Sequence, residues 1–408
     1  MMATSYPRFD GDTVGTFMEP IAHGLAARGH EIHVVLPWHP RWERGSRDGD
    51  VQFHLFKYAP VAALNIFGYA NSLEADVRLR MRALAATPLA LAAGCRAVRA
   101  VANRVNATIV HGHWVVPGGA MAALAAPSRP LVVSLHGSDV FVAERHVAAG
   151  LVARRTFRRA AYVTACSDDL RDRARALGAR EDRSVTIPYG VDGARFRPDA
   201  AARRAVRARL GLQPDDQVVL AAGRFVRKKG FEYLIEAVGL LAPERPRLHL
   251  LLAGGGDLEA ELRDRVFAAG LSHCTHFLGV LRQGEVAAAL ASADVAVVPS
   301  VRDDAGNVDG LPNVVLEALA SGTPVVASPA GGIGSVVRDG ITGLLVPERN
   351  VGSLAAAIAQ LLDQPETAGA LSSAARAWAL SEGSWAGVAA AFERVYTAAC
   401  PAPTAVFR

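Results

Sequence analysis

Short β-branched runs alternate with longer alanine-rich segments along this chain, and the alternation occurs twice. In the first half, the predicted strands are residues 31–37, 107–113, 130–137, 161–167 and 184–188. After a linker, YGVDGARFRPD (189–199), the alternation restarts with predicted strands at 217–224, 247–255, 273–279, 293–300 and 323–329. Strands that are apolar throughout and separated by helices are typical of parallel sheets covered on both faces. The pattern predicts an α/β chain of two Rossmann-like, doubly wound domains that face a central cleft.

Length and composition suit a soluble enzyme. The 408 residues leave room for two or three domains, and 51% hydrophobic with 20% charged residues argues against disorder. The four cysteines are scattered singly, so we expect neither disulfides nor a zinc site, and a reducing cytoplasm is the default. No signal-peptide pattern is visible, and the longest apolar run, residues 83–95, is too short to span a bilayer.

The first residues, MMATSYP, offer only a short strand before a loop and a helix expected from Phe17 to Arg28. A doubly wound domain normally has a fuller central strand here. Either the strand is short, or the start lies a few residues late.

Positive charge is concentrated in the first half. Residues 1–192 contain 23 lysines and arginines against 17 acidic residues, whereas residues 193–408 contain 21 against 22. A basic half can attract an anionic partner or a membrane surface. Because 41 of the 44 basic residues are arginine, a general arginine bias accounts for the same excess.

In open α/β sheets, ligands bind at loops that follow the carboxyl ends of strands. Gly15 lies in such a loop, before a helix start where backbone N–H groups can approach a phosphate or a sugar. His136 follows the predicted strand in LHGSD (135–139) and faces the expected cleft. By itself this histidine is as readily structural as functional.

A third loop, GRFVRKKG (223–230), contains Arg224, Arg227, Lys228 and Lys229 between an apolar strand and a helix. The chain has three lysines and two of them lie here, which suggests that a compact ammonium is required. Cations beside a helix start can bind a diphosphate, although a solvated basic turn would have the same composition.

A fourth loop contains Asp309 and Gly310 and leads into the helix LPNVVLEALASG (311–322). Pro312 suits a first helical turn, and Gly322 suits a helix C-cap. Because helical side chains lean toward the N-terminus, Glu317 is expected to point back to this loop. A carboxylate there can accept both hydroxyls of a ribose, and its apolar neighbours argue against a merely solvated glutamate.

One segment matches a dinucleotide-binding motif only in part. AGGGDLEAEL (253–262) follows a strand and opens a helix, like a dinucleotide fingerprint, but Glu259 stands where the third glycine is needed for close helix–strand packing. A nicotinamide or flavin cofactor is therefore not expected.

Taken together, these segments resemble the retaining glycosyltransferases of family 4, which have the GT-B fold. The segments GRFVRKKGFEYLIEAV, LLLAGGGDLEAEL, ADVAVVPS and DGLPNVVLEALASGTPVVAS match the family's nucleotide-sugar half in order and spacing; HGSD, RGHEIHVVLP and IPYGVDGARFRP match its first half. The resemblance implies an acceptor-binding domain at 1–193, a nucleotide-sugar-binding domain at 194–384, and a C-terminal helix within 385–408 that crosses back to the first domain.

The resemblance also implies roles for the cations and the helical glutamate. Arg224 and Lys229 would bind the diphosphate and stabilise its charge as it leaves. Glu317 would hold the ribose hydroxyls of the donor.

The remaining matched positions would contact the sugar and the phosphates. Asp309, Gly310 and Leu311 would contact the transferred sugar. His136 would reach that sugar from the first domain, and Gly15 would approach the phosphates. His136, Asp309 and the two clamp cations would form the catalytic set.

Three departures from the family pattern stand out. Asp309 replaces the first of two glutamates, which leaves the preferred sugar open. Tyr189 replaces an asparagine, and Gly334-Ser335 replaces Pro-Glu, but neither change touches the diphosphate clamp.

The implied reaction transfers a sugar, with retention, from a nucleotide-diphosphate sugar to the hydroxyl of a sugar or lipid-linked acceptor in cell-envelope polysaccharide or glycolipid synthesis. No aspartate-rich motif serves the diphosphate, so neither a metal nor another cofactor is expected, and no nucleic-acid partner is expected. The alternatives are a GT-B nucleotide-sugar epimerase or hydrolase and a non-catalytic sugar-nucleotide-binding protein.

Residues of the first half of the chain are expected to bind the acceptor. His113 and Trp114, in HGHWVVPGG (111–119), are expected in an acceptor-binding loop. Arginines flank an alanine- and leucine-rich stretch at 78–104, and a second cluster lies at 153–161. These segments are expected either to dock on the cytoplasmic face of a membrane or to be ordinary helices with solvated arginines.

Overall fold

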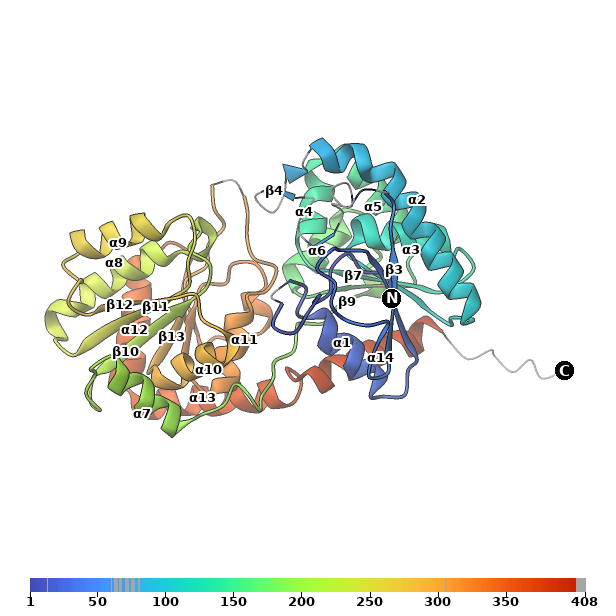
Figure 1. Ribbon diagram of the computed structural model, residues 1–408. Coiled ribbons are helices and arrows are strands. Elements are labelled where there is room, and N and C mark those ends of the chain that lie inside the picture. Colours follow the sequence, from blue (N-terminus) through green and yellow to red (C-terminus); the bar gives the residue numbers. More distant parts are fainter. Residues whose placement is uncertain are drawn as a thin grey trace. The chain divides into compact units, whose positions relative to one another are not determined.

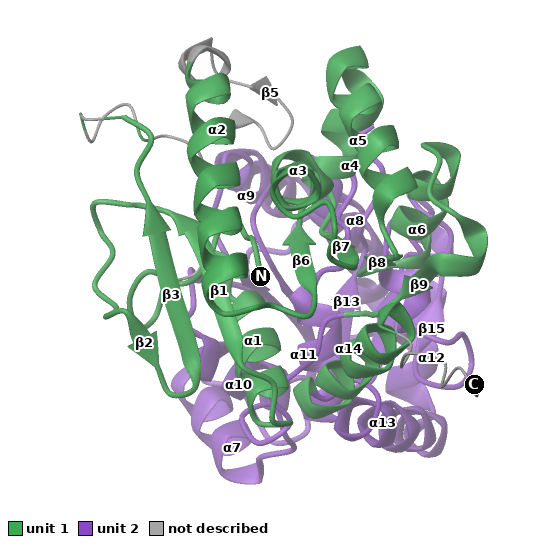
Figure 2. Cartoon of the chain, turned by 90° about the vertical axis from the view of Figure 1, so that its right-hand side faces the viewer, with its two compact units in different colours: residues 1–188, 385–408 green, residues 189–384 purple. Residues whose placement is uncertain are grey.

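In the computed structural model, the chain forms two compact units, residues 1–188 with 385–408 (unit 1) and residues 189–384 (unit 2), shown in Figure 1 and coloured separately in Figure 2. The structure describes residues 1–12, 14–59, 61, 65, 68–69, 73–74, 78–79, 81–304 and 306–400, with side chains of α2 from residue 86 onward. Unit 1 ends at Pro188 and not at the predicted residue 193. The reason is that Val191 pairs with Ser384 and its N–H donates to the Gly383 carbonyl at 2.8 Å, which ties this segment to unit 2.

The strands of unit 1 are β1 (Ile32–Pro37), β2 (Arg47–Asp48), β3 (Val51–Phe56), β4 (Leu73–Glu74), β5 (Arg78–Leu79), β6 (Val110–His113), β7 (Leu131–Leu135), β8 (Tyr162–Ala165) and β9 (Ser184–Thr186). Its helices are α1 (Met18–Ala26), α2 (Met81–Arg104), the π-helical turn η2 (Val115–Gly119), α3 (Ala120–Ala125), α4 (Ser138–Arg145), α5 (Val147–Arg159), α6 (Asp168–Ala176), the 3-10 turn η3 (Glu181–Arg183) and α14 (Trp385–Ala399).

The sheet of unit 1 has a gap at its centre that the first residues fill. Strands β6, β7, β8 and β9 run parallel in that order, and β1 runs parallel to β3. Met2 lies between the two sets and pairs with both Val35 of β1 and Gly112 of β6. The short first strand is therefore present as a bridge that joins them.

The C-terminal helix belongs to unit 1. In α14, Val388 and Phe392 are buried in the same core as Ile21 and Leu25 of α1. Figure 2 shows α14 beside α1 in the colour of unit 1. The chain thus returns to its first unit after completing the second.

The strands of unit 2 are β10 (Gln217–Ala222), β11 (Leu248–Ala253), β12 (Thr275–Gly279), β13 (Val295–Val298), β14 (Val325–Ala327) and β15 (Leu344–Leu345). Its helices are α7 (Ala200–Arg209), η4 (Arg227–Lys229), α8 (Phe231–Leu241), η5 (Ala242–Glu244), α9 (Glu259–Ala268), α10 (Gln283–Ser292), α11 (Asn313–Ser321), η6 (Ile333–Ser335), α12 (Val351–Asp363) and α13 (Pro365–Leu380).

All strand pairs of unit 2 are parallel, in the order β12-β11-β10-β13-β14-β15. This is the doubly wound order predicted from the alternating pattern. The core packs Leu234 and Ile235 of α8 and Ile358 of α12 against Leu250 and Leu252 of β11.

All ten predicted strands are present, each one to four residues shorter than its predicted range. Strand β3 and the two-residue strands β2, β4, β5 and β15 were not predicted. Within the described ranges, every helix is too short or too polar to cross a bilayer.

Candidate active site

The strand order of unit 2 reverses between β10 and β13. From β10, the chain adds β11 and β12 on one side and then β13, β14 and β15 on the other. Ligands bind at such a switch point, outside the carboxyl ends of the strands. The loop after β10 carries Arg224 to Lys229, and the loop after β13 carries Asp309. The two predicted loops therefore meet at the position that this fold favours for a ligand.

The loop after β10 is pressed against the end of β13. It closes with the turn η4 and Gly230, which has φ +65°. A Cβ at position 230 would lie 2.0 Å from the carbonyl oxygen of Pro299, so only glycine fits there. This close approach places Lys228 and Lys229 beside the loop that follows β13.

Both lysines bind Asp309. The Nζ of Lys228 lies 3.1 Å from Oδ1, and the Nζ of Lys229 lies 2.5 Å from Oδ2. The Asp309 side chain is only 15% exposed. Burial acts to raise its pKa, but Lys229 and Lys228 more than offset burial and lower the pKa to about 2. Asp309 is therefore ionised at neutral pH and neutralises part of the lysine charge.

Glu317 lies near enough to Lys229 for this lysine to act on its pKa. Its helix α11 begins at Asn313, one residue after Pro312, and ends at Gly322 in the left-handed conformation. Burial raises the pKa of Glu317 to about 7, although Lys229 and Arg195 act in the opposite direction. Lys229 thus acts to lower the pKa of two carboxylates. Asp309 is ionised at neutral pH, whereas Glu317 has a pKa of about 7.

The backbone beside Asp309 is tightly supported. A Cβ on Gly331 would lie 1.9 Å from the carbonyl oxygen of Asp309, and Gly331 has φ +60°. Leu311 is buried at 6% exposure, so its side chain anchors the segment. Backbone groups of Gly310 and Leu311 are then the parts of this segment that suit a polar ligand.

The two arginines of the loop differ in their surroundings. The Arg224 side chain is exposed at the end of β10. Arg227 instead binds both carboxylate oxygens of Glu261, at 2.8 Å for Nη1. Arg227 is committed to α9 and does not join the cluster around Asp309.

In unit 1, His136 lies one residue beyond β7 in an aromatic setting. Its ring centroid is 4.5 Å from that of Phe17 and 4.7 Å from that of Trp114. Burial lowers the pKa of His136 to about 3. The imidazole is therefore neutral at physiological pH, with one ring nitrogen donating and the other accepting. Gly15, with φ +70°, precedes α1 and accepts the Met18 N–H at 2.9 Å.

His113 is the last residue of β6, at the end of the predicted strand 107–113. Its side chain is 0% exposed, so it is not part of the surface loop expected to bind an acceptor. Its Nδ1 lies 3.1 Å from Nε2 of His136. Trp114, half-buried, follows directly and packs on the same His136 ring.

Asp139 is a supporting residue to which no role was assigned from the sequence. Oδ1 accepts the backbone N–H groups of His136 and Gly137 at 3.2 and 3.0 Å, and Oδ2 accepts that of Val115 at 2.7 Å. It is 2% exposed, and burial raises its pKa despite these bonds. Asp139 thus fixes the backbone on which His136 stands. An acidic residue three positions after a strand-end histidine was the available signal.

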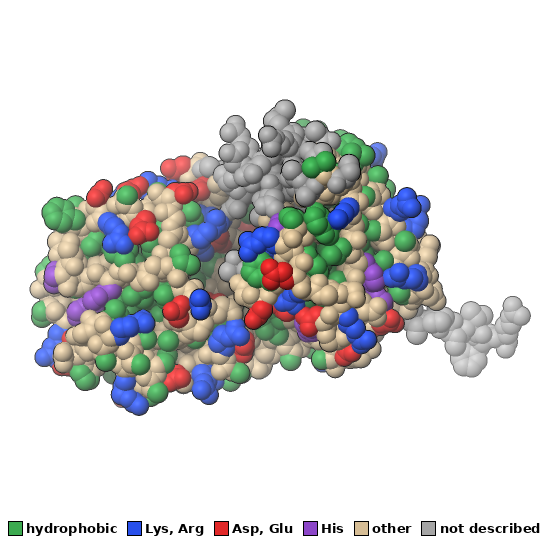
Figure 3. Space-filling model, viewed as in Figure 1, with side chains coloured by type: hydrophobic (Ala, Val, Ile, Leu, Met, Phe, Trp, Pro, Cys, Tyr) green, Lys and Arg blue, Asp and Glu red, His purple; other side chains and the backbone are tan. Residues whose placement is uncertain are grey.

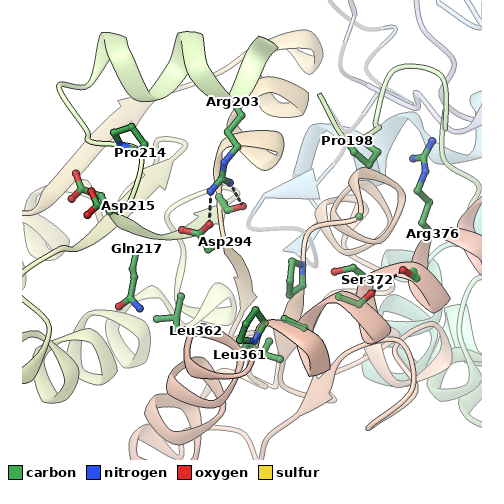
Figure 4. A pocket seen from close by; sticks show the side chains of 18 residues that line it. Pro198, Arg203, Pro214, Asp215, Gln217, Asp294, Leu361, Leu362, Ser372 and Arg376 are labelled. Carbon is green, nitrogen blue, oxygen red and sulfur yellow. Dashed lines mark hydrogen bonds and ion pairs between the residues drawn. The ribbon is translucent and has the colours of Figure 1, made fainter. Parts of the chain in front are cut away.

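A separate hollow of about 660 Å³ lies at the opposite edge of the unit 2 sheet (Figure 4). It is lined by residues at the amino ends of β10, β13 and β14, including Gln217, Asp294 and Pro324. Its main charges pair with each other, since Arg203 donates to Asp294 at 2.6 Å. The hollow is far along each strand from the Lys229–Asp309 pair and does not belong to this site.

One group in the described part of the chain has metal-ligand character: Glu19, His23 and Asp48. All three are partly exposed, and Arg44 already binds Glu19 at 2.7 Å and Asp48 at 2.5 Å. The guanidinium supplies the positive charge there, and the group is not part of the Asp309 cluster.

The unit 2 cluster combines two ammonium groups with two carboxylates, Asp309 with a lowered pKa and Glu317 with a raised pKa. Arg224 is exposed in the same loop as the lysines. Cations in a partly buried site stabilise a developing negative charge more strongly than cations in water. Carboxylates accept paired hydroxyl hydrogen bonds. The arrangement suits a ligand that has anionic groups at one point and hydroxyls on both sides.

Two family models match the chain. "Glycosyl transferases group 1" matches residues 202–378, and "Glycosyltransferase Family 4" matches residues 14–195. A GDP-mannose-dependent alpha-(1-6)-phosphatidylinositol monomannoside mannosyltransferase of Mycolicibacterium smegmatis is 36% identical over 261 residues, which is 64% of this chain and 68% of the relative. A glycogen synthase of Mycobacterium tuberculosis is 30% identical over 415 residues, which is 98% of this chain and 94% of the relative.

Solved structures show the same fold. Sucrose-phosphate synthase from Thermosynechococcus elongatus has a TM-score of 0.74 at 22% identity, over 97% of each chain. HepE from Anabaena in complex with UDP has a TM-score of 0.73 at 20% identity, over 97% of this chain and 98% of HepE.

Proposed function

Because this chain belongs to glycosyltransferase family 4 and has the GT-B fold, we propose that it transfers a sugar from a nucleotide-diphosphate sugar with retention of anomeric configuration and without a metal. The observation that carries this proposal is the cluster of Lys228, Lys229, Asp309 and Glu317 at the switch point of unit 2. The acceptor is a hydroxyl group of a sugar or of a lipid-linked glycan.

The lysine pair gives the donor diphosphate a defined place. Asp309 compensates the charge of Lys229 at 2.5 Å. A diphosphate carries more negative charge than one carboxylate, so it competes for Lys229 while Lys228 retains Asp309. Arg224, exposed at the end of the same strand, binds the diphosphate from the other side. Glu317 accepts the ribose hydroxyls, and Asp309 with the Gly310–Leu311 backbone binds the sugar.

The chemical step needs charge stabilisation more than covalent help. The bond between the anomeric carbon and the phosphate oxygen breaks, and the electron pair leaves with the diphosphate, next to Arg224 and Lys229. The acceptor hydroxyl forms the new bond from the face that the diphosphate leaves, and its proton passes to the departing phosphate oxygen. His136 contacts the sugar as a neutral imidazole, and Gly15 approaches the phosphates.

The donor is tested by thermal shift against UDP-, GDP- and ADP-sugars. A ligand that binds only the folded state at 100 times its dissociation constant stabilises by about 2.7 kcal/mol. We expect one nucleotide to stabilise native protein and not the Lys229→Ala variant. Nucleotide release without any acceptor, or donor isomerisation, would instead identify a hydrolase or an epimerase. Binding without any turnover would identify a sugar-nucleotide-binding protein.

We also propose that unit 1 meets an anionic membrane through α5. Val147 is 83% and Leu151 57% exposed, and the exposed residues Arg154, Arg155 and Arg158 follow at helical spacing on the same side. An amphipathic basic helix binds anionic lipid through apolar burial and charge, with about 1 kcal/mol from each cation. A membrane position brings the enzyme to a lipid-linked acceptor.

Other arginines that the sequence suggested for this surface are engaged elsewhere. Arg99 donates to the Ala125 carbonyl at 3.1 Å, and Arg159 donates to those of Ala126 and Pro127 at 3.1 and 2.6 Å. Arg78, Arg80 and Arg82 lie outside the described side chains. On the face shown in Figure 3, positive and negative side chains are interspersed. The α5 surface is the candidate because its exposed apolar residues and arginines lie on one side of a helix.

Co-sedimentation with anionic and neutral liposomes at low and high salt tests this surface. We expect the protein to sediment only with anionic liposomes at low salt, and Leu151→Gln to reduce sedimentation. Phe267→Gln, which replaces a 78% exposed residue of unit 2, is the matched control. A native protein that stays in the supernatant with anionic liposomes at low salt indicates a soluble acceptor.

A further inference from the structure

Three histidines form a continuous row in unit 1: His111 and His113 are buried, and His136 is partly exposed. His111 and His113 point to the same side of β6, because side chains two residues apart on a strand share a face. Their ring centroids are 4.0 Å apart, and the His113 ring is nearly parallel to that of His136, at 11° and 5.3 Å. The row leads from α14 to the predicted sugar-contacting residue.

The inner end of the row is fixed by hydrogen bonds. His111 Nδ1 lies 2.7 Å from the Tyr396 hydroxyl of α14, and its Nε2 lies 2.7 Å from Oγ of Ser134. Both ring nitrogens of His111 therefore have hydrogen-bond partners, which fix the orientation of the His111 ring beside His113. His113 can then turn little, and its Nδ1 is held at 3.1 Å from Nε2 of His136.

The tautomer of His113 follows from its other nitrogen. Nε2 is buried, and no hydrogen-bond partner for it is found among the described residues. An orphaned buried N–H group is rarer in proteins than an under-used acceptor. His113 therefore carries its proton on Nδ1 and donates to Nε2 of His136. His136 then carries its own proton on Nδ1, since burial keeps both rings neutral by lowering the pKa of each.

We propose that His113 is a positioning residue that fixes one ring orientation and one tautomer of His136, so that His136 presents its Nδ1–H as a donor. This inference rests on the proposed role of His136 in sugar transfer, but its structural part stands without it. It replaces the expectation that His113 itself touches an acceptor.

The tautomer is measured directly on the full chain labelled with ¹⁵N-histidine. Long-range proton–nitrogen correlations, with the His136 signals assigned from a His136→Gln variant, report which ring nitrogen is protonated. We expect protonated Nδ1 in native protein and in His113→Asn, whose amide N–H replaces the Nδ1–H donor. His113→Leu should show a mixture or protonated Nε2. Protonated Nε2 in native protein, or an unchanged spectrum in His113→Leu, would overturn the proposal.

Transfer kinetics give the second readout. His113→Leu should lower kcat/KM by roughly tenfold or more, because it removes one hydrogen bond between neutral groups, which is worth about 1–1.5 kcal/mol. His113→Asn should restore most of the native kcat/KM. Val133→Ala, a cavity in the neighbouring strand, controls for lost stability and should keep native kinetics. Equal kinetics for Leu and Asn at position 113 would refute the positioning role. Native kinetics for His136→Gln would instead refute the role of His136, whatever the spectra show.

Discussion

Replacing Glu317 with glutamine should stabilise the donor-free protein at alkaline pH while weakening donor binding. Burial raises the pKa of Glu317 from 4.5 to about 7. Between these values the folded state holds a proton that the unfolded state has lost, so stability falls as pH rises from 4.5 to 7 and stays lower above 7. At about 1.4 kcal/mol per pKa unit, the full penalty is about 3 kcal/mol. Glutamine cannot ionise, so the variant does not lose this stability as the pH rises.

Denaturation of both proteins at pH 5 and pH 8 measures this difference. We expect near-equal stability at pH 5 and a more stable variant at pH 8, with a midpoint higher by about 2–4 °C for each kcal/mol. Donor affinity should fall roughly tenfold, because a charged acceptor to the ribose is lost. Glu232→Gln is the matched control: Glu232 is 6% exposed and its pKa is also raised by burial, but it should leave donor affinity unchanged. A Glu317→Gln variant that is no more stable at pH 8, or that binds donor normally, refutes the reasoning.

The other predictions concern the diphosphate-binding cations Arg224 and Lys229, the backbone that supports Asp309, and the charge of the site. Lys229→Ala and Arg224→Ala should each lower transfer by roughly 100-fold or more at little cost in stability, and near-native turnover of both folded variants would remove the clamp assignment. Native donor affinity, measured by titration, should rise with pH through the Glu317 pKa of about 7 and should become pH-independent in Glu317→Gln. Gly331→Ala should impair transfer, because its Cβ would lie 1.9 Å from the Asp309 carbonyl oxygen and displace Asp309; unchanged kinetics would show that this support is dispensable. Transfer should survive EDTA, and a loss that Mg²⁺ or Mn²⁺ reverses would contradict a metal-free mechanism.

The strands predicted best are those in which nearly every residue is buried. β11, LHLLLA, is buried along almost its whole length, and a short apolar run of this kind favours a strand covered on both faces. β3, VQFHLF, alternates apolar residues with Gln52 and His54, which is the pattern of a half-buried strand and not the continuous apolar run by which the other strands were predicted. The two-residue strand β15 is held by its neighbour β14 and has no pattern of its own.

Site residues were predictable where the spacing along an element fixes direction. Helix geometry predicts that Glu317 points to the Asp309 loop, and the effect of Lys229 on the Glu317 pKa agrees with that prediction. Lys228 and Lys229 are chemically identical neighbours, and only the fold shows that both turn toward one carboxylate. The sequence placed His113 both at the end of the predicted strand 107–113 and in an acceptor-binding loop; its pairing with β7 makes it the end of a buried strand.

The anomeric configuration of the product decides whether this protein is a retaining transferase that uses a nucleotide-diphosphate sugar. The protein is incubated with the donor found by thermal shift and an acceptor of the matching glycan class, and proton NMR follows the anomeric signal from the first turnovers. We expect a new glycoside with the anomeric configuration of the donor, formed by native protein and not by Lys229→Ala. A product of opposite configuration, or free sugar in place of a glycoside, would contradict the proposed mechanism.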